Sequence, residues 1–522
     1  MKKILYAGLI LAVGCNSAHQ NNSSSTESTI ASNEDRVEYA NTITEGELKE
    51  HLYTYASDEF EGRETGDPGQ KKAVEYLKAE YQALGIPAAK GGDDYFQKVP
   101  LEVSGVPTGS ITINNEEFKL GEGVITFSSV DNKTFDIVYA GYGIEDEKYS
   151  DYNDIDIKGK YVLVKIGEPK DESGNYLLTG NTEPSVWSNW RETLTKRIEI
   201  ATEKGAEGII YYDDAFYNRA EGRYQHYLES GNGGQMSLKS DDKKVANIYV
   251  NKEVATKIYA DVDTENKAKE LNEKITLNLK NTSKEVDSEN VVALIKGKSK
   301  PDEYLVISAH LDHVGVDPDG NVFNGADDDG SGTVAILEIA EAFKKAAEEG
   351  NGPERSIVFL HVTGEEKGLL GSEYYSENPI FPLANTVADL NIDMIGRIDP
   401  KRDGDRNYIY LIGSDKLSTD LHELSEEVNE KYTNIELDYT YNDENDPNRF
   451  YYRSDHYNFA KHNVPIIFYF NGTHADYHKI TDTPDKINYD LLTNRAKLVF
   501  QTAWEIANRP ERLVVDKAQP TK

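Results

Sequence analysis

The stretch YLVISAHLDHVGVDPDGNVFNGADDDGSG, residues Tyr304 to Gly332, is the segment around which the rest of the chain is organised. It opens with an apolar run of strand length, Tyr304 to Ala309. His310 and Asp312 follow at once, and a Gly- and Asp-rich loop then leads to the three aspartates of 327–329. A strand that ends in imidazole and carboxylate groups, followed by a carboxylate-rich loop, indicates half of a metal site.

Strands and helices alternate from this stretch to the end of the chain. The pattern predicts a helix from near Ser331 to near Gly350, a second over 419–431 and a third over 489–507. Apolar runs of strand length lie at 290–295, 356–362, 387–392, 408–412 and 464–470. This alternation predicts an α/β sandwich around a largely parallel sheet.

The composition is that of a polar globular chain with a strong acidic excess. Its 522 residues are 38% hydrophobic and 29% charged, and the formal net charge is -35. This excess argues against nucleic acid and anionic membrane surfaces as partners, because their phosphates would be repelled. Solubility, rather than attraction of a cationic substrate, is the simpler reason for the acidity.

The amino terminus carries the pattern of an export signal. A short basic start precedes an apolar run, Ile4 to Val13, and small residues lead to Cys15, the one cysteine of the chain. The run is too short to span a membrane. The arrangement resembles the lipobox of bacterial lipoproteins, which implies a signal peptide over 1–14, lipidation of Cys15, and a lipid anchor with a flexible linker over 15–40. The alternative is a plain signal peptide with an incidental cysteine.

The body of the chain is predicted to consist of a catalytic domain interrupted by an insertion. Its first part covers 41–102, and its second part covers 288–510 and is followed by a polar tail, 511–522. Between them, 103–287 is rich in short β-type runs such as 208–212 and 246–250. Pieces such as RIEIATEKGAEGIIYYDD resemble a protease-associated domain. A generic β-rich insertion is the alternative.

Ligand-type side chains follow four of the predicted strands. Function in open α/β sheets gathers beyond the carboxyl ends of the strands. The residues found there are His310, Asp312, Glu365, Glu366, Asp393, His474, Asp476, Tyr477 and His478. This set of imidazoles and carboxylates without thiols suits Zn²⁺ or a similar divalent ion.

Five motifs in this order, HLDH, NGADDDGSG, TGEEKGLLGS, NIDMIG and YHKITDTPD, resemble the zinc exopeptidase family of the bacterial leucyl aminopeptidases and glutamate carboxypeptidase. The resemblance covers about Ile43 to Pro510. It implies a three-layer sandwich around a mixed, largely parallel sheet (the phosphorylase/hydrolase-like zinc peptidase fold), with an inserted protease-associated domain. It also implies two Zn²⁺ per chain and peptide substrates.

The same resemblance implies a role for each matching residue. His310 and Asp393 would bind one Zn²⁺, Glu366 and His478 the other, and Asp328 would bridge both. The Asp328–Asp329 peptide bond would be cis. Glu365 would act as the general base, Asp312 would orient the His310 ring, and Tyr477 would steady the tetrahedral intermediate.

Structural explanations compete at several of these positions. Asp327 to Asp329 suit the start of a helix, and Asp317 could begin a calcium loop, although its sixth and twelfth positions are Val322 and Asp328. Structural roles are expected for His361, His462, His474, Asp455 and His456. The chain has no HExxH or GxSxG motif, so a zincin or a serine hydrolase is not expected.

The expected function is a zinc exopeptidase, an aminopeptidase held by lipid to a bacterial membrane outside the cytoplasm, on the periplasmic or cell-surface side. A carboxypeptidase or dipeptidase of the same superfamily is the first alternative, and Arg397 and Arg453 are candidates for reading a substrate carboxylate. A catalytically inactive binding relative is the second alternative, and a cyclase of amino-terminal glutamine is the third. The oligomeric state and the side-chain preference stay open.

Overall fold

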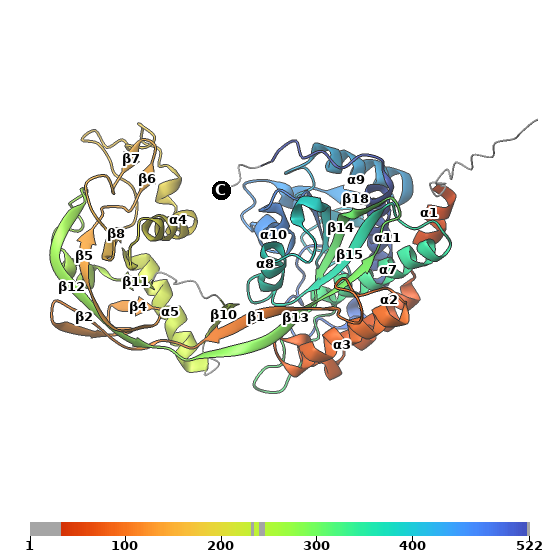
Figure 1. Cartoon of the computed structure of the whole chain (residues 1–522), viewed down its shortest axis with the longest axis horizontal. Helices are drawn as coiled ribbons and strands as arrows, with labels where there is room; N and C mark the ends of the chain where they lie inside the picture. Colours follow the sequence, from red (N-terminus) through yellow and green to blue (C-terminus); the bar gives the residue numbers. More distant parts are fainter. Residues whose placement is uncertain (1–32, 231–233, 240–245, 519–522) are drawn as a thin grey trace, which may run out of the picture.

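The computed structural model describes residues 33–230, 234–239 and 246–518. The predicted signal peptide and Cys15 lie outside these residues. Figure 1 shows two lobes, each built on its own sheet, with long strands passing between them. Among the described residues, no helix combines the length and the apolar character needed to cross a membrane.

The larger lobe contains a mixed sheet of nine strands with a parallel centre. Parallel pairing joins the four strands β15, β14, β16 and β19, so their carboxyl ends meet at one edge. The order across the sheet is β10 (Gln235–Leu238), β1 (Phe96–Ser104), β13 (Ser283–Ile295), β15 (Arg355–Val362), β14 (Lys300–His310), β16 (Thr386–Ile392), β19 (Ile466–Phe470), β17 (Tyr408–Ile412) and β18 (Glu436–Asp438).

Alternate residues of the central strands enter two different apolar clusters, because successive strand side chains point to opposite faces. Leu305 and Ile307 of β14 pack with one set of helices, and Val306 packs with another. The first set is α1 (Asn33–Ala40), α2 (Glu45–Tyr55), α3 (Pro68–Ala83), α7 (Gly332–Glu348), α9 (Thr419–Tyr432) and α11 (Tyr489–Asn508). The second is α8 (Leu370–Glu377) and α10 (His456–Ala460). The predicted α/β class with a mixed sheet is confirmed.

The smaller lobe lies between β1 and β13, whose register pairs Ser104 with Ser283. Its eight-stranded sheet has the order β3 (Glu116–Lys119), β2 (Thr108–Ile113), β12 (Lys269–Lys280), β5 (Val130–Tyr139), β8 (Tyr161–Lys165), β9 (Gly208–Tyr212), β11 (Ala246–Val250) and β4 (Val124–Thr126). The other elements of this lobe are α4 (Trp190–Glu203), α5 (Asp214–Ser230), α6 (Lys252–Ile258) and the strand pair β6 (Glu145–Asp146) and β7 (Tyr149–Ser150).

Short 3₁₀ helices connect several of these elements. They cover Asp58–Arg63, Val186–Ser188, Leu383–Asn385, Thr440–Asn442, Phe450–Tyr452 and Pro484–Lys486. The turn that carries the three aspartates covers Ala326–Ser331 and leads directly into α7.

The amino-terminal end of the described body is more ordered than the sequence predicted. The linker predicted over 15–40 contains α1, because the Arg36 guanidinium donates to Glu505 (2.7 Å) and Tyr39 stacks on Trp504 with ring centroids 5.6 Å apart. The tail predicted over 511–522 is exposed over most of its described residues, although Leu513 is buried. The contacts of α1 join the two ends of the chain, so local sequence patterns do not reveal them.

Candidate metal centre

Four neighbouring strand ends supply the site. β14 ends at His310, Glu365 and Glu366 follow β15, Asp393 follows β16, and the loop after β19 leads to His478. Because these strands run parallel, residues far apart in the sequence meet at one edge of the sheet. The structure therefore brings together all five predicted ligand positions.

The first group of donor atoms centres on His310, whose side chain is 1% exposed. Its Nε2 atom lies 3.2 Å from Oδ1 of Asp328 and 3.7 Å from Oδ1 of Asp393. These three residues have the arrangement of a possible metal site. The ring is oriented through its other nitrogen, since Nδ1 donates to the carbonyl oxygen of Asp312 at 3.0 Å.

The second group uses the other carboxylate oxygen of Asp328. Nε2 of His478 lies 2.9 Å from this Oδ2 atom and 3.0 Å from Oε1 of Glu366. His313, which the sequence analysis did not assign, places Nδ1 3.1 Å from the same Glu366 oxygen and 3.7 Å from Asp328 Oδ2. Asp328 therefore faces both groups, and its peptide bond to Asp329 is cis, as the resemblance implies.

The donor atoms fit metal ions better than they fit one another. Five of these donor atoms lie close to other polar atoms, yet within the described residues none of the five makes a hydrogen bond. These atoms are Nε2 of His310, Nδ1 of His313, Oδ2 of Asp328, Oε1 of Glu366 and Nε2 of His478. Buried polar atoms left without partners are costly. Nitrogen and oxygen donors that converge in this way are the set that binds Zn²⁺.

Electrostatics supports a cation at the centre. Burial raises the pKa of Glu365 well above its usual range, and the carboxylates of Glu366 and Asp393 raise this pKa further. Burial would also raise the pKa of Asp328, but the adjacent imidazoles of His310 and His478 outweigh it and hold this pKa well below its usual range. Carboxylates held this close repel one another unless positive charge lies between them.

Asp312 lies where the sequence predicted, but it makes a different contact. Its carboxylate is 4.0 Å from His310 Nδ1, and the backbone carbonyl holds the ring instead. The carboxylate accepts from the backbone N–H of Glu365 at 3.2 Å and from the Thr65 hydroxyl at 2.7 Å. Asp312 thus ties the end of β14 to the residue predicted as the base.

Tyr477 lies beside the second group of donors. Its ring stacks on His478 with centroids 4.0 Å apart. Burial raises the pKa of its hydroxyl, and the carboxylates of Asp328 and Glu366 raise it further, so the hydroxyl stays protonated and able to donate. It lines a pocket with Met394, Phe450, Arg453, Phe468, Phe470, Thr473 and three of the carboxylates, Asp328, Glu365 and Asp393.

The two candidate arginines differ in their surroundings. The Arg397 guanidinium donates to Asp476 at 2.8 Å and lies 3.8 Å from Asp482, so it belongs to the support of the His478 loop. Arg453 is exposed and lines the pocket, and its guanidinium lies 5.0 Å from the centroid of the Phe450 ring. Among the described residues, Arg453 has no carboxylate partner within ion-pair distance.

The structure also shows the surroundings of Asp317, His361 and His474, for which other roles were considered. Asp317 accepts from the backbone N–H groups of Asp319 and Asn321 in an exposed turn, so the calcium-loop interpretation is not supported. His361 is buried in the core 2.7 Å from the Tyr81 hydroxyl. Nε2 of His474 lies 3.1 Å from Oδ2 of Asp327.

The segment that carries Asp455 and His456 packs beneath the site. The carboxylate of Asp455 accepts from the Ser372 hydroxyl at 2.6 Å, and burial raises its pKa to about 7. The His456 ring stacks on Phe468, with centroids 4.6 Å apart. Both contacts are architectural, as the sequence suggested.

His313 is the residue that sequence reasoning missed. The motif HLDH contains two histidines three positions apart, and only the first follows the strand directly. The chain bends after β14, which brings the second histidine, 0% exposed, back against Glu366. The second histidine of the motif was visible in the sequence, but the direction of its side chain depends on the loop that follows β14.

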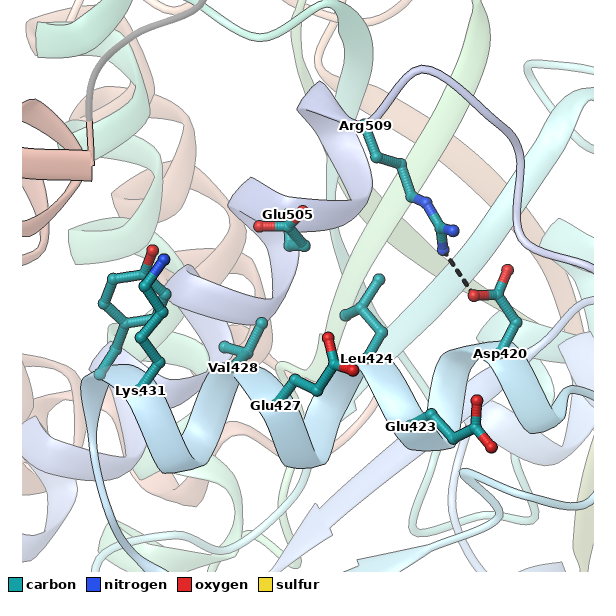
Figure 2. Close-up of a pocket in the computed structure, with 9 residues that line it drawn as sticks. Asp420, Glu423, Leu424, Glu427, Val428, Lys431, Glu505 and Arg509 are labelled. Atoms are coloured by element: carbon teal, nitrogen blue, oxygen red, sulfur yellow. Dashed lines mark hydrogen bonds and ion pairs between the residues drawn. The ribbon is translucent and has the colours of Figure 1, made fainter.

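A larger groove lies elsewhere, between α9 and α11. Figure 2 shows acidic side chains along it, with Asp420 accepting from Arg509 at 2.9 Å. Its volume is about 420 Å³ and it contains no imidazole. The chemistry of the strand ends, rather than cavity size, therefore identifies the candidate site.

Comparison with known proteins agrees with this site. Residues 290–503 match the family described as peptidase family M28. Leucine aminopeptidase 1 of Pyrenophora tritici-repentis is 31% identical over 225 residues, which are 42% of this chain and 55% of that protein. A probable glutamate carboxypeptidase of Arabidopsis thaliana is 37% identical over 106 residues, 20% of this chain and 14% of that one. This chain thus spans about half the length of the first curated relatives it matches.

The fold is also found in a solved structure. An aminopeptidase from Aneurinibacillus sp. strain AM-1 has a TM-score of 0.50 at 19% identity, covering 92% of this chain and 98% of that chain. At this identity the likeness concerns the fold alone. Together, the comparisons relate residues 290–503, which carry the candidate metal centre, to a family of peptidases.

Proposed function

We propose that this chain, whose residues 290–503 match peptidase family M28, is a two-zinc aminopeptidase that removes amino-terminal residues from peptides. One observation carries the proposal. Two groups of imidazole and carboxylate donors share the single carboxylate of Asp328, one oxygen in each group. A carboxylate shared in this way is what a pair of adjacent metal ions requires.

Each residue then has a definite task. His310, Asp393 and Asp328 would hold one Zn²⁺, and Glu366, His478 and Asp328 the other. Zinc, when bound, supplies Lewis acidity that lowers the pKa of water from about 15.7 towards about 7. Glu365 accepts the proton of the attacking water and gives it to the leaving amine.

The residues around the base support these transfers. Asp312 holds the backbone N–H of Glu365, so the base keeps its position relative to β14. Burial beside the metal positions suits Glu365 to proton transfer, because it increases the affinity of the carboxylate for the proton that it takes from water. Tyr477, protonated beside His478, donates a hydrogen bond to the oxyanion that forms at the scissile carbonyl.

The pocket beside the site would receive the first side chain of the substrate. Phe450, Phe468 and Phe470 give it aromatic walls, which favour an apolar group. Arg453 at the same pocket favours the alternative of a carboxypeptidase or dipeptidase, because a guanidinium without a carboxylate partner can bind a substrate carboxylate. The occupied base position argues against an inactive binding relative.

We also propose the cellular setting that the sequence suggests. Lipidation at Cys15 would anchor the protein to a bacterial membrane outside the cytoplasm, on the periplasmic or cell-surface side. The smaller lobe would be a protease-associated domain. Neither proposal alters the assignment of the metal centre.

The test compares substrates with free and blocked amino termini. Aminoacyl anilides and amino-blocked peptides are assayed with and without a chelator. Cleavage of free-amine substrates alone, abolished by the chelator, supports the proposal. Release of carboxyl-terminal residues from blocked peptides would select the alternative.

The base is tested by Glu365→Gln, with the exposed Glu423→Gln as matched control. Loss of the base should lower kcat by about 10²- to 10⁴-fold. Zinc content, measured by elemental analysis, should stay at two per chain. Turnover at the rate of the control would show that another group accepts the proton.

A further inference from the structure

We propose that His313 is a fourth protein ligand of the second metal position, together with His478, Glu366 and Asp328. The inference rests on the proposed two-metal centre. It goes beyond the ligand set that the resemblance implies, which contains one histidine for each metal. The second position would thus be closed by protein atoms, while the first has three protein donors.

The distances around this position match a tetrahedral shell. Zinc bonds of about 2.0–2.1 Å place tetrahedral donors about 3.3 Å from one another. Four donor separations in this group are 2.9, 3.0, 3.1 and 3.7 Å, which bracket that value. His313 contributes two of the four, so its nitrogen lies where a ligand would be.

The orientation of His313 agrees with these distances. Its Nδ1 atom lies 3.1 Å from Glu366, but hydrogen-bond geometry fails, as it does for His478. A histidine that only supported Glu366 would direct an N–H at that oxygen. The rings of His313 and His478 lie at 76° to each other with centroids 5.6 Å apart, so their nitrogens approach the same carboxylates from different directions.

Packing holds the His313 ring in place. A Cβ atom at Gly325 would lie 2.5 Å from Cγ and Cδ2 of the ring. The backbone N–H of His313 donates to the carbonyl of Arg63 at 3.3 Å. No described atom accepts a hydrogen bond from Nε2, so packing rather than an outer hydrogen bond orients the ring.

If protein atoms fill the second metal position, the two metals have different roles. Zinc sites with four protein ligands are structural, and catalytic sites keep an open coordination position. The group of His310, Asp393 and Asp328 leaves such an opening, so it would receive the water and the scissile carbonyl. Zinc would therefore bind the second position first and more tightly.

The experiment measures zinc binding by the metal-free full chain in competition with a chromophoric chelator. The variants are His313→Ala, His313→Asn, the reference His478→Ala and the control His462→Ala. Asparagine keeps an N–H donor near the position of Nδ1 but is a poor zinc ligand. Circular dichroism of each metal-free variant reports folding.

A ligand role predicts that both His313 variants lose the tighter zinc, as His478→Ala does. The loss of zinc affinity should be larger than the loss of about 10- to 100-fold that follows removal of a residue which only supports a ligand. Added imidazole should restore zinc binding to His313→Ala. If His313→Asn binds the tighter zinc within about tenfold of the unmodified chain, His313 only positions Glu366 and the proposal is wrong. Failure of the unmodified chain to bind two zinc ions would refute the proposed function instead.

Discussion

Gly325 gives a direct test of how the loop after β14 shapes the site. It has a φ of +55°, in the left-handed region, and a Cβ atom there would lie 2.4 Å from the carbonyl oxygen of Asp328 and 2.5 Å from the ring of His313. Gly325→Ala therefore meets two costs. The left-handed backbone costs about 1–2 kcal/mol for alanine, and the crowding adds about 1–3 kcal/mol.

Gly320 is the matched control. Its φ is +85°, and an added Cβ would meet nothing within 4 Å. Gly320→Ala should therefore show only the backbone cost of about 1–2 kcal/mol. The difference between the two variants isolates the contact with His313 and Asp328.

The assay is denaturant unfolding of the metal-free chain, followed by zinc titration. Gly325→Ala should lower the free energy of unfolding by about 2–5 kcal/mol, and it should also weaken the tighter zinc site. Gly320→Ala should leave zinc binding unchanged. Equal effects of the two substitutions on stability and on zinc would refute the reasoning. Adding His313→Ala to Gly325→Ala should return part of the lost stability, because it removes one of the two crowded neighbours.

Three further predictions concern the core, the pocket and the metals. Burial lowers the pKa of His361 to about 3, so as the pH falls the unfolded state takes up this proton before the folded state does. The contribution of His361 to the free energy of unfolding is therefore complete above about pH 6.5 and falls by about 1.4 kcal/mol per pH unit towards pH 3. His361→Gln should remove this slope, measured by urea unfolding at pH 7 and pH 5. Arg453→Leu should lower kcat/KM more than about tenfold for substrates with a carboxylate near the scissile bond. Arg449 lines a different pocket, with Tyr441 and Tyr451, so Arg449→Leu should not have this effect. Zinc at about 100 times its Kd should raise the free energy of unfolding by about 2.7 kcal/mol, measured as a thermal shift that a chelator reverses.

The strands of the larger sheet could be predicted because burial determines them. The runs predicted at 387–392 and 408–412 correspond to β16 (Thr386–Ile392) and β17, whose residues are all buried. Such strands read as continuous apolar segments. Their carboxyl ends locate the metal site because the topology of a parallel sheet brings these ends together.

Features that depend on loop geometry or on distant partners could not be predicted. The helix α1 is held by contacts of Arg36 with Glu505 and of Tyr39 with Trp504, two residues of α11 near the other end of the chain. The direction of His313 depends on the bend at 314–325. The contact that Asp312 makes was not predicted either: its carboxylate turns towards Glu365, because the backbone carbonyl already holds the ring of His310.

The three consecutive aspartates do more than begin a helix. Asp329 accepts from the backbone N–H groups of Gly332 at 2.9 Å and Met394 at 3.0 Å, so it joins the first turn of α7 to the segment after β16. Asp327 accepts from the N–H of Gly396 at 2.7 Å in the same segment. The two outer aspartates thus hold the 394–396 backbone against the turn. This fixes the separation between Asp328 and the ligand before that segment, Asp393. The metal-facing carboxylates therefore cannot relax apart, although they repel each other, and that repulsion is relieved when a cation binds between them.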